Sequence, residues 1–130
     1  MVTLLSTGLV ALAHYTNFTS TSTYADGFKW IACGLSSSSE VSTATGLSSE
    51  ITAGTMARST ATLTYETNTS VWSHTFTSTT NLSVWEYGIF DSSSGPGGHC
   101  LMRHLGSAAK TLVDTDTLTV TLKLVNASTT

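Results

Sequence analysis

The chain has little charge, little proline and little cysteine. Only 10% of its 130 residues are Asp, Glu, Lys or Arg, and it contains one proline and two cysteines. The five basic residues are scattered, so they provide no patch for phosphate groups, which argues against nucleic acid as a partner. The apolar residues 2–13 are too few to span a bilayer as a helix, so we expect no membrane partner either.

Serine and threonine, in contrast, make up about a third of the chain. Disordered segments rich in these residues lack aromatic and β-branched neighbours. Here the threonines alternate with Val, Leu, Trp and Phe, which is typical of residues on the faces of β-strands. A surface with few charges and many hydroxyls suits partial cover by neighbouring subunits, although a threonine-rich soluble domain is equally consistent with the composition.

Residues 82–105 form the centre of the pattern. Residues 82–91 and 99–105 are predicted strands, joined by the turn 92–98, where Pro96 has no amide for a sheet and glycines permit positive φ. The first strand is apolar on both faces. Both faces must therefore be covered, either inside a packed sheet or by a partner chain.

Period-two alternation predicts further strands on either side of this hairpin, whereas residues 106–116 are expected to form a loop. The predicted inward side chains are Ala61, Leu63 and Tyr65; Trp72, His74 and Phe76; and Leu118, Val120, Leu122 and Leu124. About seven or eight strands predict an all-β fold, an antiparallel β-sandwich that is jelly-roll-like or immunoglobulin-like. The chain is long enough for one such domain, assigned to residues 28–130.

Residues 1–27 are predicted to be an N-terminal strand or arm. Residues 2–13 are apolar and end in Ala-Leu-Ala, which resembles a signal-peptidase site. No Lys or Arg precedes them, and Ser6, Thr7 and Gly8 interrupt the apolar run, so the arm is favoured over a cleaved signal.

The residues suited to a soft metal are Cys33, His74, His99, Cys100 and His104, and their spacing fits no zinc motif. His99 and Cys100 point to opposite faces of a strand, and Cys100 lies about 13 Å from His104 along it. We therefore expect no metal and no cofactor. The two cysteines are expected to be buried thiols, on strands that could be neighbours.

Glu86 lies in an otherwise apolar strand. A buried carboxylate is costly unless it is paired, so Arg58 or Arg103 is the expected partner, in an ion pair that fixes strand register. No Gly-x-Ser-x-Gly elbow is present, and no spacing brings two glutamates into one cleft. We therefore expect no catalytic residues and no enzymatic activity.

The order of segments resembles a family of small virion structural proteins of tailed bacteriophages. The resemblance covers roughly residues 30–124. Its matching pieces are residues 31–34, 45–50, Arg58, 86–91, 94–98, 101–103 and 116–121. The turn at residues 97–100 is longer and more polar than is usual in the family, and the first thirty residues show little likeness.

This resemblance implies a non-enzymatic protein of the virion, assembled in the host cytoplasm. The expected role is a capsid decoration or cement protein that docks on the major capsid protein, with a tail or fibre component as an alternative. Sparse charge, the apolar excess of the central strand and the apolar residues 2–13 predict a homo-oligomer, and the resemblance suggests that it is a trimer. The candidate interface residues are Leu4, Leu5, Leu9, Val10, Leu12, Trp85 and Tyr87.

A carbohydrate- or receptor-binding sandwich is the other alternative. In that case aromatic side chains would be displayed in a groove, where they stack on sugars, rather than buried in the core. The candidates are Trp30, Trp72, Trp85 and Tyr87.

Overall fold

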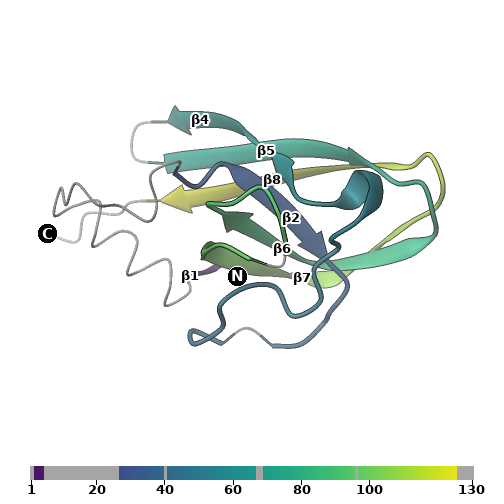
Figure 1. Ribbon diagram of the computed structural model, residues 1–130, viewed down its shortest axis with the longest axis horizontal. Coiled ribbons are helices and arrows are strands. Elements are labelled where there is room, and N and C mark those ends of the chain that lie inside the picture. Colours follow the sequence, from purple (N-terminus) through teal and green to yellow (C-terminus); the bar gives the residue numbers. More distant parts are fainter. Residues whose placement is uncertain (1, 5–26, 40, 67–68, 96, 126–130) are drawn as a thin grey trace, which may run out of the picture.

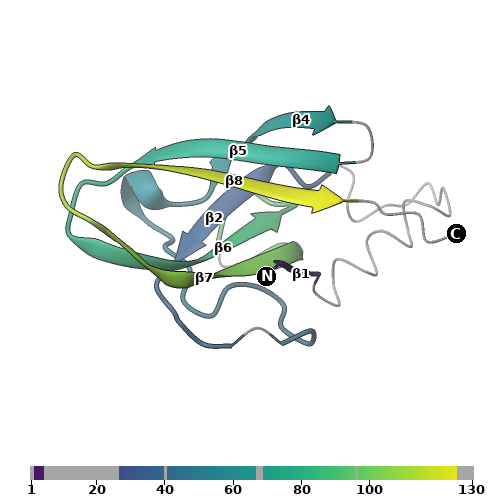
Figure 2. The ribbon, with the colours of Figure 1, turned by 180° about the vertical axis from the view of Figure 1, so that it is seen from behind.

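The protein is an antiparallel β-sandwich in the computed structural model, which describes residues 2–4, 27–39, 41–66, 69–95 and 97–125 (Figures 1 and 2). The larger sheet has the order β1-β7-β6-β2-β3 and the smaller one β4-β5-β8. The strands are β1 (Val2–Leu4), β2 (Trp30–Gly34), β3 (Ser59–Thr60), β4 (Thr62–Glu66), β5 (Thr69–Thr77), β6 (Leu82–Phe90), β7 (Cys100–Leu112) and β8 (Thr117–Val125). Among the described residues the one helical element is a 3-10 turn, η1 (Gly54–Met56). The all-β sandwich prediction is confirmed.

Residues 69–125 form one long antiparallel ribbon that folds over on itself. Strand β5 pairs with β8, with Thr77 opposite Thr117, and the same register continues where Leu82 of β6 lies opposite Leu112 of β7. The fold-over lies between these pairs, so the two halves belong to different sheets (Figure 1).

Ser78 holds the corner of the ribbon. It is fully buried, its amide donates to the carbonyl of Asp116 at 2.7 Å, and its carbonyl accepts from the amide of Thr115 at 2.8 Å. Its hydroxyl donates to the carbonyl of Thr80 at 2.6 Å. The backbone pairing therefore continues through the bend, which satisfies polar groups that the turn would otherwise bury unpaired.

The predicted loop at residues 106–116 is wrong for its first part, because β7 runs on to Leu112. The register shifts between Val84 and Glu86, where Trp85 of β6 faces the longer segment 106–109 of β7. This bulge contains Gly-Ser-Ala-Ala, which has low β propensity, so the sequence pattern indicated a loop. Pairing with β6 overrides that local preference.

The main core lies between the two sheets. Buried side chains from the larger sheet, such as Ile31 and Ile89, pack with Trp72 and Phe76 of β5. Val120 and Leu122 of β8 are buried as predicted, and Leu118 and Leu124 pack against the same cluster. Leu63 was predicted to be inward but is 52% exposed, because β4 is an edge strand with no neighbour on one side among the described strands. The side chain of Tyr65 lies outside the described residues.

A second, smaller apolar cluster covers the outer face of the larger sheet. Ala32, Phe90 and Cys100 are buried there, with Ala44 and Leu47 packed over them. These two residues belong to the serine-rich loop that follows β2, described at residues 35–39 and 41–49. The loop that follows β2 thus covers the outer face of β6. This arrangement satisfies the requirement, inferred from the sequence, that both faces of the central strand be covered.

The N-terminal strand β1 lies at the edge of the larger sheet. It pairs antiparallel with β7, with Val2 opposite His104 and Leu4 opposite Met102. Of the candidate interface residues in the predicted arm, Leu4 belongs to β1, and its side chain is not described. Leu5, Leu9, Val10 and Leu12 lie outside the described residues.

Candidate functional site

Glu86 and Arg103 form a buried ion pair beneath the serine-rich loop. Arg103 Nε donates to Glu86 Oε2 at 2.7 Å, and the two side chains are 1% and 0% exposed. Glu86 also accepts the amides of Ser48 and Ser49, at 2.9 and 2.7 Å. Arg103 donates through its other nitrogen to the carbonyl of Ser38 at 2.9 Å.

This network mainly anchors the loop. The residue directly opposite Glu86 on β7 is Leu105, so the ion pair crosses the β6–β7 ladder diagonally. Three further bonds connect the pair to the main chain at Ser38, Ser48 and Ser49. The sequence offered two partners for Glu86, and the structure pairs it with Arg103. The expected role in strand register is thus joined by a second role, closing the loop over the sheet.

Gly34 makes room for the carboxylate. It lies opposite Glu86 on β2, and a Cβ atom built there would overlap the glutamate side chain. The backbone of Gly34 does not have positive φ, so the requirement for glycine here is one of space. The glycine at the end of β2 is therefore needed so that the side chain of Glu86 can fit beside it.

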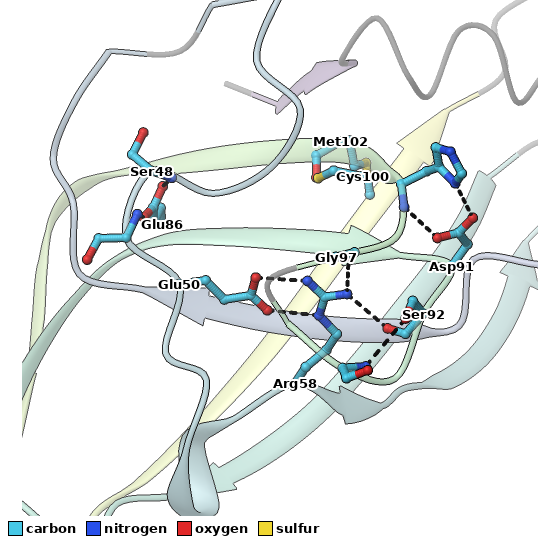
Figure 3. Close-up of polar contacts among 12 residues, drawn as sticks. Ser48, Glu50, Arg58, Glu86, Asp91, Ser92, Gly97, Cys100 and Met102 are labelled. Carbon is cyan, nitrogen blue, oxygen red and sulfur yellow. Dashed lines mark hydrogen bonds and ion pairs between the residues drawn. The ribbon is translucent and has the colours of Figure 1, made fainter.

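Arg58 does not pair with Glu86, contrary to one of the two expectations. Its Nε and Nη2 donate to the two oxygens of Glu50, each at 2.8 Å, and its Nη1 donates to the carbonyls of Ser92 and Gly97 at 3.0 and 2.9 Å. The guanidinium lies 3.6 Å from the centre of the Phe90 ring. Figure 3 shows Arg58 reaching between Glu50 and the turn after β6. Arg58 thus connects the loop, β6 and the hairpin turn.

Asp91 and His99 form a pair that the sequence analysis did not single out. Asp91 accepts from the amide of His99 at 2.6 Å, and its other oxygen lies 2.7 Å from His99 Nδ1 (Figure 3). The two residues flank the turn that Arg58 holds. The sequence did contain a signal for this pair. Asp91 follows one predicted strand and His99 begins the next, and a hairpin brings such positions together.

A pocket of about 480 Å³ lies between the serine-rich loop and the hairpin turn. It is lined by Glu50, Arg58 and Phe90 together with small residues such as Gly46 and Gly97. The two charges neutralise each other in a bidentate pair, and the arginine is also bound to main-chain carbonyls. No buried side-chain nitrogen or oxygen within the described residues lacks a hydrogen-bond partner. The polar side chains of this pocket therefore stabilise the fold by bonding to each other and to the main chain.

The two cysteines are buried thiols on opposite faces of the larger sheet. Cys33 belongs to the core between the sheets, and Cys100 to the cluster beneath the loop. The idea that they are strand neighbours is wrong, because β6 lies between β2 and β7. Burial raises the pKa of each thiol from 9.0 to about 12. Across the described part of the chain, no three His, Cys, Asp or Glu residues gather in a way that would hold a metal ion.

Most of the aromatic side chains that the structure describes are buried in the fold. Trp72 is buried, and its indole nitrogen donates to the carbonyl of Phe28 at 2.7 Å. Tyr87 is 8% exposed and belongs to the core. Trp85 is half-buried, as is Trp30, which lies beneath the ammonium of Lys29 at 4.8 Å.

The outer face of the smaller sheet is covered with hydroxyl groups. The register places side chains from all three strands in shared rows, with Thr62, Ser73 and Thr121 in one of them. The residues of this hydroxyl face are Thr62 and Thr64 of β4, Thr69, Ser73, Thr75 and Thr77 of β5, and Thr117, Thr119 and Thr121 of β8. Most are exposed, and the one charged side chain described on this face is Lys123.

Neighbouring hydroxyls on this face bond to one another across the strands. The Oγ1 atoms of Thr75 and Thr119 are 2.8 Å apart, and Ser73 Oγ lies 3.2 Å from Thr121 Oγ1. Each such pair satisfies part of its own hydrogen-bonding capacity and leaves the threonine methyl groups on the surface. The face is therefore polar enough to be exposed and only weakly hydrated compared with a charged one.

Comparisons with known proteins identify no relative. No family model, no curated protein and no solved structure matches the chain. Within the described residues, the structure contains no helix with the length and apolar character needed to cross a membrane.

We expect Glu86→Ala to lower the free energy of unfolding by about 3–5 kcal/mol, because it leaves Arg103 buried without its charged partner. Replacing both residues with leucine should cost less than the single change, since no charge is then stranded. Urea denaturation followed by tryptophan fluorescence measures both values. An unchanged midpoint for Glu86→Ala would show that the pair does not stabilise the fold.

Gly34→Ala should destabilise the protein by about 2 kcal/mol, because the added methyl group displaces the Glu86 carboxylate from the loop amides. Gly46→Ala is the matched control, since its Cβ would lie 3.7 Å from Phe90, an ordinary contact. The control should change stability by no more than about 0.5 kcal/mol. Equal thermal midpoints for the two variants would contradict the steric argument.

The free energy of unfolding should fall as the pH rises from about 9 towards 12. Both thiols ionise near pH 9 when unfolded but stay protonated in the fold, because burial raises each pKa to about 12. Unfolding at high pH thus releases protons and is favoured. Tyr87, whose pKa burial raises from 10.0 to about 12, adds to the same trend.

Urea denaturation at pH 8 and pH 11 measures this pH dependence. The double variant Cys33→Ala with Cys100→Ala should lose less stability between the two pH values than the parent protein. If both proteins lose the same amount, the thiols are not its source.

Proposed function

We propose that the protein is a non-enzymatic structural component of a bacteriophage virion, a capsid decoration protein that docks on the head lattice. The observation that carries this proposal is the hydroxyl face of β4, β5 and β8. It is a continuous sheet surface with one described charge, Lys123, and with threonines in all three strands. Docking would bury this surface against the major capsid protein.

The physical chemistry of the face favours a protein partner. The centres of protein interfaces are depleted in charged residues, because burying a charge is costly unless it is paired. Threonine hydroxyls that already bond to each other, such as those of Thr75 and Thr119, need fewer new partners when water is removed. Their methyl groups supply apolar area. Such a face is suited to adhesion without chemistry.

The roles of the buried arginines and aromatic residues also support a structural function. Arg58 and Arg103 each bind a glutamate and main-chain carbonyls, and these bonds hold the loop and the hairpin turn in place. Trp72 and Tyr87 are buried, so they are not displayed for stacking on sugars. Trp30 and Trp85 are half-buried. Because two of the four aromatic candidates are buried, a structural protein is favoured over a carbohydrate-binding module.

The choice of the virion rests on the resemblance of residues 30–124 to small phage structural proteins. The glutamate, arginine and glycine of that resemblance are the residues that close the loop over β6, namely Glu86, Arg103 and Gly34. A tail or fibre component would use a docking face of the same chemistry and is the alternative location. A homo-oligomer, a trimer, is part of the proposal.

Thr75→Lys tests the docking face, because it places a charge in the middle of the hydroxyl face. We expect the variant to fold normally and to bind purified particles at least about tenfold more weakly, since the lysine must be desolvated without a partner. Thr111→Lys, an exposed threonine on β7, is the matched control and should bind as the parent does. Co-sedimentation with particles lacking the protein measures binding. Absence of the chain from purified virions by mass spectrometry, or equal binding of both variants, would overturn the proposal.

A further inference from the structure

We propose that the turn at residues 113–116, between β7 and β8, belongs to the surface that docks on the major capsid protein, and that Thr115 contacts the partner there. This inference rests on the proposed function and adds a residue outside the hydroxyl face to the docking surface. It is supported by the backbone conformation of Thr115, by the lack of a bond from its side chain within the fold, and by the place of the turn beside the hydroxyl face.

Thr115 has a left-handed backbone conformation. Its φ is 72°, and it is the one non-glycine residue with positive φ among the described residues. Glycine adopts this conformation freely, and asparagine and aspartate enter it more readily than other residues. Threonine is branched at Cβ, so its side chain crowds the backbone there. Strain of this kind persists only where the surrounding structure enforces it.

Two local motifs enforce the conformation at this position. The amide of Asp116 donates to the carbonyl of Val113 at 3.1 Å, and a positive φ at the third residue of such a turn is the requirement of type II. Ser78 bonds to both Thr115 and Asp116, so one residue lies opposite two, as in a β-bulge whose first residue is left-handed. Both motifs favour glycine at residue 115. The fold therefore fixes the conformation of this residue but does not call for a threonine.

The side chain of Thr115 is not needed inside the fold. It is exposed, and its hydroxyl makes no hydrogen bond to any described residue. At three other left-handed positions the chain has glycine, with φ of 68° at Gly27, 75° at Gly54 and 68° at Gly98. A strained side chain that bonds to nothing in its own fold points to a contact outside it.

The turn lies directly beside the hydroxyl face. Thr115 is two residues before Thr117, where β8 and its part of the face begin (Figure 1). Its amide bonds to Ser78, the residue after Thr77, and Thr77 is paired with Thr117. The turn also exposes Val113, at 50%. A partner that covers the end of the hydroxyl face would therefore meet the turn as well.

The exposed groups of the turn suit the rim of a protein interface. The side chain of Val113 and the methyl group of Thr115 provide apolar area that docking can remove from water. The Thr115 hydroxyl can donate one hydrogen bond and accept others from polar groups of the partner. Asp114, between them, is exposed, and an interface rim leaves such a charge in contact with water.

Thr115→Gly tests this inference through stability and binding together. We expect its Tm to rise by about 2–4 °C, because glycine relieves the backbone strain. We expect its binding to purified particles that lack the protein to weaken about fivefold, because the contact is lost. Thr115→Asn should change both quantities in the same directions without the flexibility of glycine. Differential scanning calorimetry measures Tm, and co-sedimentation measures binding.

Thr43→Gly is the matched control. Thr43 is an exposed threonine without positive φ, on the loop that covers the other sheet, so its replacement should neither raise Tm nor weaken binding. The inference is overturned if Thr115→Gly does not raise Tm, or if it raises Tm and binds as the parent does. It is also overturned if Thr115→Asn keeps parental binding, since the loss with glycine would then come from flexibility of the turn.

The outcome for Thr75→Lys separates this inference from the docking function. If both Thr115 variants bind as the parent does and Thr75→Lys does not, the turn lies outside the docking surface and the docking function stands. If the parent itself does not bind particles, both proposals are wrong.

Discussion

The rest of the structure depends on the buried carboxylate of Glu86. It lies on a face of the larger sheet that the other sheet does not cover, so a separate element has to keep water from it. The loop after β2 does so, and it is held by its own amides at Ser48 and Ser49 bonding to the carboxylate. A charge that would be unfavourable in an apolar strand becomes the attachment point for a covering loop, with Arg103 balancing it.

The outer faces of the two sheets differ, because one is covered by the chain and the other is exposed. The larger sheet is covered by its own chain, through Ala44 and Leu47 packed on a second apolar cluster. The smaller sheet presents a hydroxyl face on β4, β5 and β8. Of the two outer faces, the one that the described chain leaves exposed is therefore that of β4, β5 and β8. The cover that the apolar outer face of β6 requires is supplied, at least in part, by the chain itself.

The sequence predicted a residue of the candidate site only where its side chain did not fit the polarity of the segment around it. Glu86 stood out because it interrupts an apolar strand, and that conflict predicted an arginine partner. Glu50 and Arg58 did not stand out, since each lies in a polar stretch, and their pairing requires the loop to fold back on the sheet. The hairpin pair of Asp91 and His99 was missed for a similar reason, because its meaning depends on the length of the turn.

Local pattern was enough to determine the all-β class, the alternating core of β8 and the need for cover on both faces of β6. These follow from side-chain period and burial, which act over a few residues. Tertiary structure alone decided that residues 106–112 belong to β7, that Leu63 is exposed at an edge and that Cys33 and Cys100 lie on opposite faces. Each of these depends on which strands become neighbours. Which strands become neighbours is decided when one ribbon folds across the two sheets. The paired strands of that ribbon, such as β5 and β8, are separated by tens of residues in the chain.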